Sequence, residues 1–325
     1  LLENTSNESF LRSKFVDGAE LEELMKDPGV NLQTSSPEHK IQKDFHNEAP
    51  LDFTLPEPRE KMQAALQEWR QSLGQTYPLY INHKAITTER SISRENPSNK
   101  DEVLGHIHIA GCAEAEQALN GAKAAFLEWK QTPAEKRAEI IDKLADLILR
   151  DRYRLSALEV LEVGKPWAEA DGDIIEAIDF CRYYAKEMRA LAVPQRIGHV
   201  LGETSFYLYE PRGVSLVIAP WNFPLAILTG MVSASLVTGN TVLMKPAEQS
   251  SLVAHELMKL LMEAGVPEGV VQFIPGLGEE IGEFLTGHKD VDLIAFTGSK
   301  QVGLHIIEKS GKTQTGQKNV KRCII

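Results

Sequence analysis

The chain has 325 residues with a formal net charge of −11, and 42% of its residues are hydrophobic. This composition supports one large or two ordinary buried cores, and the acidic balance argues against a nucleic-acid-binding surface. No apolar run approaches the roughly 18 residues that span a membrane. The three cysteines are widely spaced and form neither a metal-binding pattern nor a disulfide framework, so a reducing cytoplasm is the expected setting.

The first part of the chain, to about residue 58, is polar and rich in Pro, Asn, Asp and Ser, which is typical of a linker. It starts with LLENTSNESF, which lacks the basic start and apolar core of a secretory signal. It also lacks an initiator methionine, so we expect the chain to begin inside a longer protein. From residue 59, the segment REKMQAALQEW predicts a helix.

The clearest helix is predicted for residues 132–155, TPAEKRAEIIDKLADLILRDRYRL. Thr132 is expected to be its N-cap, Pro133 to occupy the first turn, and Glu135 to complete a capping box. Its apolar residues recur at helical spacing on one face. These residues are Ile140, Ile141, Leu144, Leu147 and Ile148.

A regular alternation of strands and helices follows from residue 213. Strands are predicted at GVSLVIA, TVLM, VVQFI and DLIAF, and helices at PLAILTGMVSASLVTGN, SSLVAHELMKLLMEAG, EEIGEFLTGH and SKQVGLHIIEKSG. This order, with short Gly and Pro connections, predicts a parallel sheet covered by helices on both sides. Because ligands bind such sheets at the carboxyl ends of the strands, the segments that follow the strands form the candidate site.

The first two of these segments each allow a functional and a structural interpretation. Asn222, in the rigid loop Pro220–Pro224, has a side-chain N–H that suits a developing oxyanion. On the loop alone, however, a turn that caps the next helix is the stronger interpretation. Lys245 and Glu248 suit the hydroxyl groups of a ribose, but a solvated ion pair is the commoner interpretation of an isolated Lys–Glu pair.

Glycine-rich turns follow the third and fourth strands. The glycines of PGLGEEIG would let the backbone approach a pyrophosphate, although their spacing differs from the G-x-G-x-x-G fingerprint. FTGS, residues 296–299, offers backbone N–H groups for a phosphate or simply a helix N-cap. Four such loops on one sheet edge favour a binding site, with no competing carboxylate pair or His–Cys cluster. His288 and His305 are interpreted as surface or packing residues.

The order and spacing of these motifs resemble the aldehyde dehydrogenase superfamily over roughly residues 79–325. The resemblance is carried by APWNFPLAI, GNTVLMKPAEQSS, PGLGEEIG and AFTGSKQVG. KPAEQSS, LIAFTGSKQVGL, KTQTGQKNVKR and EADGDIIEAIDFCRYYA are further similar to the Δ1-pyrroline-5-carboxylate (L-glutamate-γ-semialdehyde) dehydrogenases. LLENTSNESFLR resembles the last helix of the proline dehydrogenase barrel in bifunctional proline-utilisation enzymes.

The resemblance implies an α/β fold of the aldehyde dehydrogenase type, with an incomplete Rossmann-type parallel sheet, flanking helices and an oligomerisation β-hairpin at about residues 193–212. Residues 1–58 would be a remnant of the proline dehydrogenase barrel and a linker. Residues 59–325 would be the N-terminal, NAD-binding part of the aldehyde dehydrogenase domain, without the catalytic domain. The complete protein would be a cytoplasmic homo-oligomer, with FAD and any peripheral membrane contact only in its proline dehydrogenase part.

The resemblance also assigns roles to individual residues. Asn222 would be the catalytic oxyanion-hole residue, and Lys245 and Glu248 would hold the adenosine ribose of NAD. The other implied cofactor contacts are Ile218, Pro220, Trp221, Gly278, Gly282, Phe296, Thr297, Gly298, Ser299 and Val302. No metal ligand is implied, and the substrate of the complete enzyme would be the small molecule L-glutamate-γ-semialdehyde, oxidised to glutamate.

The nucleophile and the general base of the family have no match in this chain. The family places its cysteine in a Gly-Gln-x-Cys motif and its base in Glu-Leu/Met-Gly-Gly-Lys, and the sequence contains neither. Cys323 has the apolar neighbours Ile324 and Ile325, which disfavour a thiolate, so we interpret it as a packing residue. Cys112 and Cys181 match no catalytic position. The chain alone is therefore expected not to turn over.

Two other interpretations remain open. The chain could belong to an aldehyde dehydrogenase that acts on other aldehydes, although its N-terminal resemblance argues against this. It could also be a truncated, non-catalytic module for cofactor binding or assembly. A Gly-Gln-x-Cys motif encoded after Ile325 would exclude the second interpretation.

Overall fold

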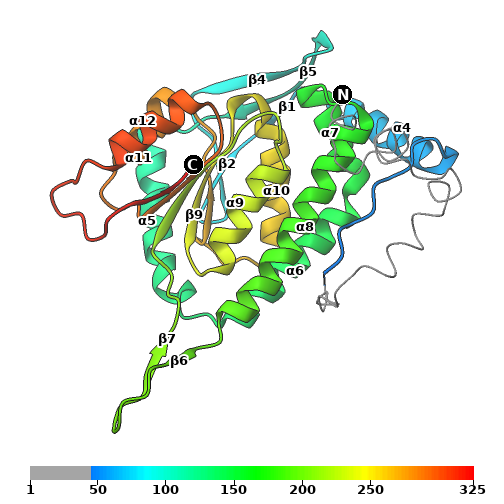
Figure 1. Cartoon of the computed structure of the whole chain (residues 1–325). Helices are drawn as coiled ribbons and strands as arrows, with labels where there is room; N and C mark the ends of the chain where they lie inside the picture. The colour runs from blue at the N-terminus through cyan, green and yellow to red at the C-terminus, as the bar shows by residue number, and fades with distance from the viewer. Residues whose placement is uncertain (1–44) are drawn as a thin grey trace, which may run out of the picture. The chain divides into compact units, whose positions relative to one another are not determined.

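A seven-stranded sheet forms the centre of residues 45–325, the part of the chain that the computed structural model describes (Figure 1). Its strand order is β12-β11-β8-β9-β10-β2-β3, and the first five strands are parallel. They are β8 (Val214–Ile218), β9 (Thr241–Lys245), β10 (Val271–Phe273), β11 (Leu293–Phe296) and β12 (Arg322–Ile324). Four of these five strands were predicted from the sequence, and their parallel order is confirmed.

The other two strands make the sheet mixed. β2 (Leu79–Ile81) pairs antiparallel with β10 and with β3 (Lys84–Ile86). A second, three-stranded sheet has the order β1-β5-β4, with β1 (Gln75–Tyr77), β4 (Ser91–Asn96) and β5 (Asn99–His108). None of these five strands was predicted from the sequence. β1, β2 and β3 are only three residues long, which is too short to show an alternating pattern.

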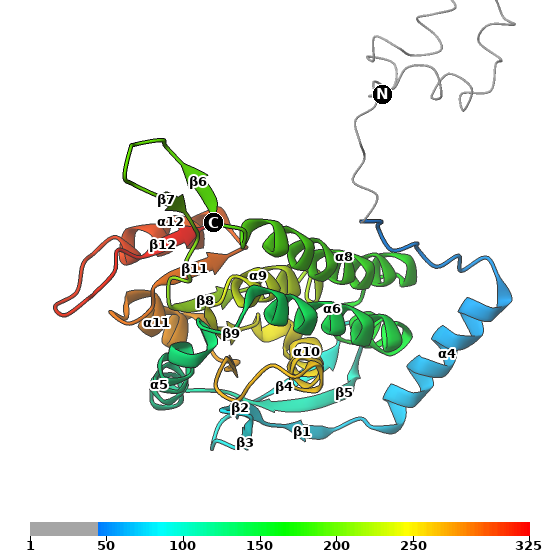
Figure 2. The same ribbon diagram turned by 90° about the horizontal axis from the view of Figure 1, so that it is seen from below.

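Helices cover both faces of the large sheet (Figure 2). On one face lie α5 (Cys112–Trp129), α11 (Glu283–Gly287) and α12 (Lys300–Ser310). On the other face lie α6 (Ala134–Arg150), α8 (Trp167–Leu191), α9 (Ala226–Val237) and α10 (Ser251–Ala264), and α4 (Pro56–Gln71) and α7 (Arg152–Val163) pack against that layer. The helix predicted for residues 132–155 is therefore two helices that meet at Asp151.

The two faces bury two separate apolar cores. In β9, Val242 and Met244 point into the core on the side of α9 and α10, whereas Leu243 points into the core on the side of α5. In β8, Val217 and Leu216 divide in the same way. Burial on both faces explains why these strands are continuous apolar runs in the sequence.

The predicted capping of α6 is wrong. The helix begins after Pro133, and no side chain caps it. The guanidinium of the buried Arg137 donates a hydrogen bond to the carbonyl of Thr132, which holds the start of the helix. Glu135 forms an ion pair of 2.9 Å with Arg189 of α8 instead of a capping box. The apolar face of α6 packs against α8, as the helical spacing predicts.

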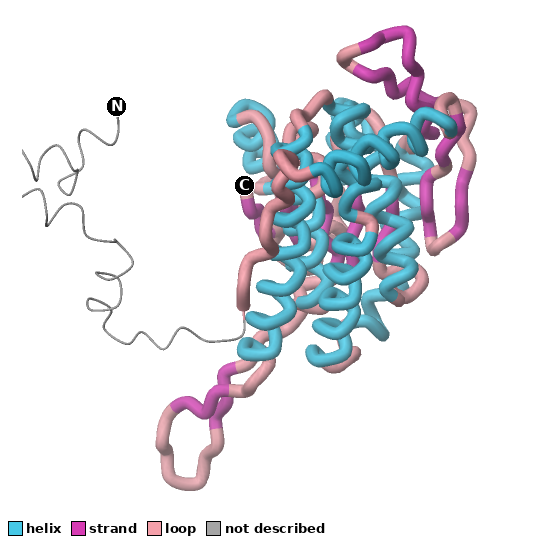
Figure 3. Tube along the Cα trace, turned by 90° about the vertical axis from the view of Figure 1, so that its right-hand side faces the viewer, coloured by secondary structure: helices cyan, strands magenta, loops and turns pink. Residues whose placement is uncertain are grey.

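A β-hairpin projects away from the body between α8 and β8 (Figure 3). Its strands, β6 (Gln195–Ile197) and β7 (Ser205–Tyr207), pair antiparallel, and all six strand residues are exposed. The hairpin expected at about residues 193–212 is therefore present, while its role in assembly stays a prediction.

The N-terminal predictions fall mostly outside the described residues. The proposed proline dehydrogenase remnant and most of the linker belong to residues 1–44, which the structure does not describe. Within the described part, helix α4 begins at Pro56, slightly before the boundary expected at residue 58, because a proline fits the first turn of a helix. No helix among residues 45–325 is long and apolar enough to span a membrane.

Candidate functional site

A cavity of about 530 Å³ opens at the carboxyl ends of β8 and β9, between the segment 278–287 and helix α12. Five residues predicted to contact a cofactor line it: Ile218, Lys245, Gly278, Gly282 and Val302. Six further lining residues were not predicted to do so, namely Glu279, Glu283, Thr286, Gln301, His305 and Ile306. The position agrees with the rule that open α/β sheets bind ligands beyond the carboxyl ends of their strands.

The Lys245–Glu248 pair is not a solvated surface pair. The side chain of Lys245 is only 4% exposed, and its Nζ lies 3.1 Å from Glu248 Oε1. The same carboxylate oxygen accepts a hydrogen bond of 2.9 Å from the backbone N–H of Gly278. Glu248 therefore joins the loop after β9 to the glycine-rich turn after β10, next to the cavity that Lys245 and Gly278 line.

The glycines of the glycine-rich turn have two different roles: one is required by the packing, and two line the cavity. A Cβ on Gly276 would lie 2.6 Å from Ile281 Cδ1 and 2.9 Å from the carbonyl of Ala110, so the packing requires glycine there. A Cβ on Gly278 or Gly282 would meet no atom closer than 3.9 Å. Because Gly278 and Gly282 line the cavity, side chains at these positions would occupy the cavity without disturbing the packing around it.

The turn itself is a π-helical segment, η3 (Gly278–Gly282), rather than the start of a regular helix over residues 279–288. Helix α11 begins only at Glu283 and is five residues long. Extra-wide turns of this kind occur frequently at functional sites. Here the wide turn places two consecutive helical turns, from Gly278 to Thr286, along one wall of the cavity.

The cavity also carries charged groups from both walls. Glu283 Oε1 lies 2.5 Å from His305 Nε2, and Lys309 donates a hydrogen bond to the other carboxylate oxygen. The hydrogen bond from Lys309 is the main cause that lowers the pKa of Glu283. His305, which was interpreted as a surface or packing residue, is indeed exposed, and it also lines the cavity.

Asn222, Trp221 and Phe223 lie at a different cavity of about 590 Å³, together with Lys165 and several acidic residues. The acidic residues are Glu169, Asp173 and Glu176. The side chain of Asn222 is exposed and makes no hydrogen bond within the described part of the chain. Helix α9 has no side-chain cap, so the interpretation of Asn222 as a helix cap is wrong.

Helix α9 is instead held at its N-terminus by Asp173, a buried residue of α8. Asp173 Oδ1 and Oδ2 accept hydrogen bonds from the backbone N–H groups of Ala226 and Leu225, at 3.0 and 3.3 Å. Lys165 Nζ lies 3.0 Å from Asp173 Oδ2 and 4.6 Å from the centre of the Phe223 ring. These contacts fix the segment that immediately follows Asn222.

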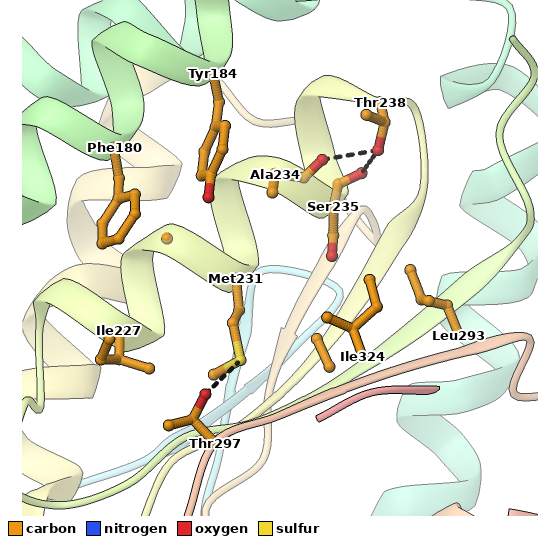
Figure 4. Close-up of a pocket in the computed structure, with 12 residues that line it drawn as sticks. Phe180, Tyr184, Ile227, Met231, Ala234, Ser235, Thr238, Leu293, Thr297 and Ile324 are labelled. Carbon is orange, nitrogen blue, oxygen red and sulfur yellow. Dashed lines mark hydrogen bonds between the residues drawn. The ribbon is translucent and has the colours of Figure 1, made fainter. Parts of the chain in front are cut away.

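The residues of the loop after β11 lie on both sides of the sheet and have different contacts. Phe296 is buried in the core beside α12, and Ser299 caps α12 by accepting a hydrogen bond of 3.3 Å from the N–H of Val302. Thr297 lies on the other side of the sheet, where its Oγ1 is 3.9 Å from the sulfur of Met231. There it lines an apolar cavity of about 420 Å³ between α8, α9, β11 and β12 (Figure 4).

The predicted cofactor residues are thus only partly brought together. Pro220 and Gly298 line none of the three cavities, and Phe296 is a packing residue. The expected roles of all these residues stay predictions. Among residues 45–325, no group of three or more metal-ligating side chains occurs.

Comparison with known proteins identifies the family of the chain. A model of the aldehyde dehydrogenase family matches residues 84–324. The chain belongs to the aldehyde dehydrogenase family. Its relatives include 1-pyrroline-5-carboxylate dehydrogenase of Bacillus pumilus (strain SAFR-032), 46% identical over 86% of this chain and 54% of that protein. Another is 1-pyrroline-5-carboxylate dehydrogenase 2 of Bacillus subtilis (strain 168), 44% identical over 82% of this chain and 52% of that protein.

Solved structures give the same family. Proline utilization A from Bdellovibrio bacteriovorus, inactivated by N-propargylglycine, is 55% identical with a TM-score of 0.86, over 100% of this chain and 34% of that chain. The 1-pyrroline-5-carboxylate dehydrogenase from Thermus with bound NAD is 43% identical with a TM-score of 0.84, over 86% of this chain and 54% of that chain. This aldehyde dehydrogenase chain spans about half the length of the curated relatives it matches.

No cysteine of this aldehyde dehydrogenase chain lies at any of the three cavities. Cys323 is the central residue of β12, where its sulfur is 3.0 Å from Ser310 Oγ and packs against the core. Cys181 is fully buried in α8, and burial raises the pKa of its thiol. Cys112 is exposed at the start of α5. The interpretation of Cys323 as a packing residue therefore agrees with its surroundings.

The cavity residues that sequence analysis missed lie on two facing segments, residues 279–286 and helix α12. His305 and Ile306 follow Val302 at helical spacing, and Thr286 follows Gly282 in the same way, whereas Glu283 is the direct neighbour of Gly282. Spacing from the predicted residues was therefore an available signal. What the sequence does not show is that these two segments lie face to face across one cavity.

Proposed function

We propose that this chain is the cofactor-binding half of an NAD-dependent L-glutamate-γ-semialdehyde dehydrogenase, which carries out the second step of proline catabolism within a bifunctional proline-utilisation enzyme. One observation carries the proposal. The cavity at the strand ends joins a buried lysine, a glutamate and two open glycines, in a chain whose relatives are named 1-pyrroline-5-carboxylate dehydrogenases.

The residues of the cavity fit a dinucleotide. Lys245 would donate to the adenosine ribose hydroxyl groups, and Glu248 would accept from one of them. Because Gly278 and Gly282 have no side chains, the backbone of the π-helical turn can come close to the adenosine and the adjoining pyrophosphate. A carboxylate at the ribose repels a 2′-phosphate, so NAD⁺ should be preferred to NADP⁺.

Asn222 would act at the reacting end of the cofactor. Its free side-chain N–H would stabilise the oxyanion formed when the enzyme's thiolate adds to the aldehyde. Bound NAD⁺ supplies the hydride acceptor. Asp173 and Lys165 hold the segment after Asn222, which gives the amide the fixed position that such a donor needs. The nucleophile and the base would come from motifs that these 325 residues do not contain.

The cavity beside Asn222 suits an aldehyde that carries a positive charge. Glutamate-γ-semialdehyde has an α-ammonium group, and Glu169 and Glu176 line this cavity in addition to the ion pair of Lys165 and Asp173. Glu176 is half-buried, and burial is the main cause that raises the pKa of its carboxyl group. A bound ammonium group would stabilise the ionised carboxylate and so gain from this position. This charge pattern favours an amino-acid aldehyde over an uncharged one.

We also propose that the complete enzyme is at least a dimer, joined through the β6–β7 hairpin. Large side chains at residues 206–209 are all exposed on it: Phe206, Tyr207, Leu208 and Tyr209. A contiguous exposed apolar surface of this kind marks an interaction site. Light scattering of the complete enzyme should give at least twice the mass of one chain. A monomer at concentrations well above those of an assay would contradict the proposal.

The proposed cofactor site can be tested through the cavity glycines. Gly282→Val should abolish NAD⁺ binding to the 325-residue chain, because the added side chain occupies the cavity and has no close neighbour to displace. Isothermal titration calorimetry measures the binding, and thermal unfolding shows whether the variant still folds. A folded wild-type chain that does not bind NAD⁺, or a variant that binds it unchanged, would refute the site.

A further inference from the structure

The cavity that would hold the adenosine has the shape of a slot between two walls. One wall is the backbone of Gly278 and Gly282, and the other carries Val302 and Ile306 of α12. Glycine backbone lies on one side and branched aliphatic side chains lie on the other, with Glu279, Gln301 and His305 as polar residues of the same lining. A planar aromatic ring with polar edges can stack between the two walls and form hydrogen bonds at its rim.

The proposed ribose site lies beside the second turn of the glycine wall. Lys245 lines the cavity at the carboxyl end of β9, and its Nζ pairs with Glu248. A Cβ on Gly282 would lie 3.9 Å from Lys245 Cε, so this second turn is next to the lysine. On the opposite wall the lining residues of α12 run from Gln301 to Ile306. A ribose held by Lys245 therefore places its base between the two walls, close to Glu283, the residue after Gly282.

A carboxylate lies at this second turn. Glu283 lines the cavity, and His305 and Lys309 of α12 hold its two oxygens from the opposite wall. The hydrogen bond from Lys309 lowers the pKa of Glu283, which keeps the group ionised at neutral pH. An ionised carboxylate only accepts hydrogen bonds, and its two oxygens offer about four acceptor positions. Two positions are used, which leaves capacity for a donor on a bound ring.

We propose that Glu283 selects the base of the cofactor, by accepting a hydrogen bond from the 6-amino group of adenine. This inference rests on the proposed cofactor site and adds a determinant of base specificity to it. A 6-oxo purine presents a carbonyl oxygen at the same place, and two acceptors facing each other repel. The ribose anchored at Lys245 and Glu248 prevents the ring from shifting to offer another donor.

The test compares two cofactors that differ at one position of the base. NAD⁺ and nicotinamide hypoxanthine dinucleotide are titrated separately into the wild-type 325-residue chain. We expect the hypoxanthine form to bind about tenfold more weakly, the scale of losing one hydrogen bond to a charged group at a partly exposed position. Because this comparison needs no substitution, it does not depend on whether a variant folds.

The variant Glu283→Gln identifies the residue. Its side-chain amide can donate to a 6-oxo group as well as accept from a 6-amino group, so the two cofactors should bind with nearly equal affinity. Glu308→Gln is the matched control, since Glu308 is a carboxylate on α12 that also pairs with a lysine, Lys312, but lies outside the cavity. The control should keep the tenfold preference for NAD⁺.

The outcomes separate this inference from the function on which it rests. Equal binding of both cofactors to the wild-type chain would overturn the role of Glu283 and leave the cofactor site intact. A preference that survives unchanged in Glu283→Gln would also overturn it. If the folded wild-type chain bound neither cofactor, both the proposed function and this inference would fail. Preference for NAD⁺ that is lost only in Glu283→Gln would support the inference.

Discussion

The residues of this chain enclose one end of the proposed cofactor cleft and leave the other end exposed. At the adenosine end, Lys245 is buried, Glu248 joins two loops, and α11 and α12 enclose the cavity. At the reacting end, Asn222 is exposed and Trp221 and Phe223 are each more than two-fifths exposed. If the proposed cleft is correct, this difference means that cofactor binding and aldehyde chemistry are separable, and that these residues carry mainly the first.

The two ends nevertheless share one structural device. At each end, one strand-end loop leads into a helix whose N-terminus is held by a buried carboxylate from a distant helix. Asp173 of α8 accepts from the first N–H groups of α9, and Glu162 of α7 accepts from Leu252 and Val253 of α10, at 2.8 and 2.9 Å. A negative group at a helix N-terminus also interacts favourably with the helix dipole.

The largest expected effect is the absence of catalysis. The purified 325-residue chain should form no NADH from glutamate-γ-semialdehyde, because none of its cysteines lies at a cavity and it lacks the family's nucleophile and base motifs. Absorbance at the NADH band measures the rate. Turnover above that of a Cys323→Ala control would show that the chemistry is not separable from this half.

The second effect concerns the support of the reacting end. Lys165→Met should destabilise the fold by about 3 kcal/mol, because it removes the cation that compensates the buried Asp173 and Glu159. Burial, reinforced by the charge of Asp173, already raises the pKa of Glu159 well above its ordinary value. Urea unfolding measures the change.

Its matched control is Lys136→Met, which removes an exposed pair with Glu139 and should cost less than about 1 kcal/mol. Lys165→Met should leave NAD⁺ affinity nearly unchanged, since Lys165 lines only the cavity beside Asn222. A large loss of NAD⁺ affinity in this variant would contradict the claim that the two ends of the cleft act independently.

The third effect is a pH dependence at the adenosine end. Burial raises the pKa of Glu162 from 4.5 to about 7, against the hydrogen bonds from α10 and the charge of Arg94. Between these two values the folded state binds more protons than the unfolded state, so stability should fall as the pH rises from about 4.5 to about 7. The contribution of this one group is at most about 3 kcal/mol.

Glu162→Gln does not titrate, so its stability should fall less over the same pH interval than that of the wild type. Urea unfolding at several pH values measures the difference between the two slopes. Parallel slopes would show that Glu162 keeps an ordinary pKa in the folded protein, and that its contacts with α10 outweigh burial.

The sequence predicted the sheet better than the site. Continuous apolar runs between Gly and Pro turns identified β8 to β11, because a strand that is buried on both faces has apolar residues at nearly every position. The ends of these strands then located Lys245, Glu248 and the cavity glycines. Thr297 lines the cavity on the other face of the sheet, since a loop residue can turn to either side and the sequence does not fix which, and its expected role stays a prediction.

The residues that sequence analysis could not place depend on long-range contacts. Asp173 lies more than fifty residues before the helix that it holds, and Glu162 about ninety residues before its helix. Glu283 and His305 face each other only because α11 and α12 pack on the same side of the sheet. Thr132 had every local feature of an N-cap, yet the distant packing of Arg137 decided the start of α6.

The measurement that tests the central claim most directly is a titration of NAD⁺ into the wild-type chain and into Lys245→Ala. If Lys245 holds the adenosine ribose, the substitution should weaken binding by about one to two powers of ten, the scale of one charged hydrogen bond. Lys259→Ala is the control, because Lys259 forms a similar pair with Glu256 on α10 and does not line the cavity. Equal NAD⁺ affinities for wild type and Lys245→Ala would contradict the account.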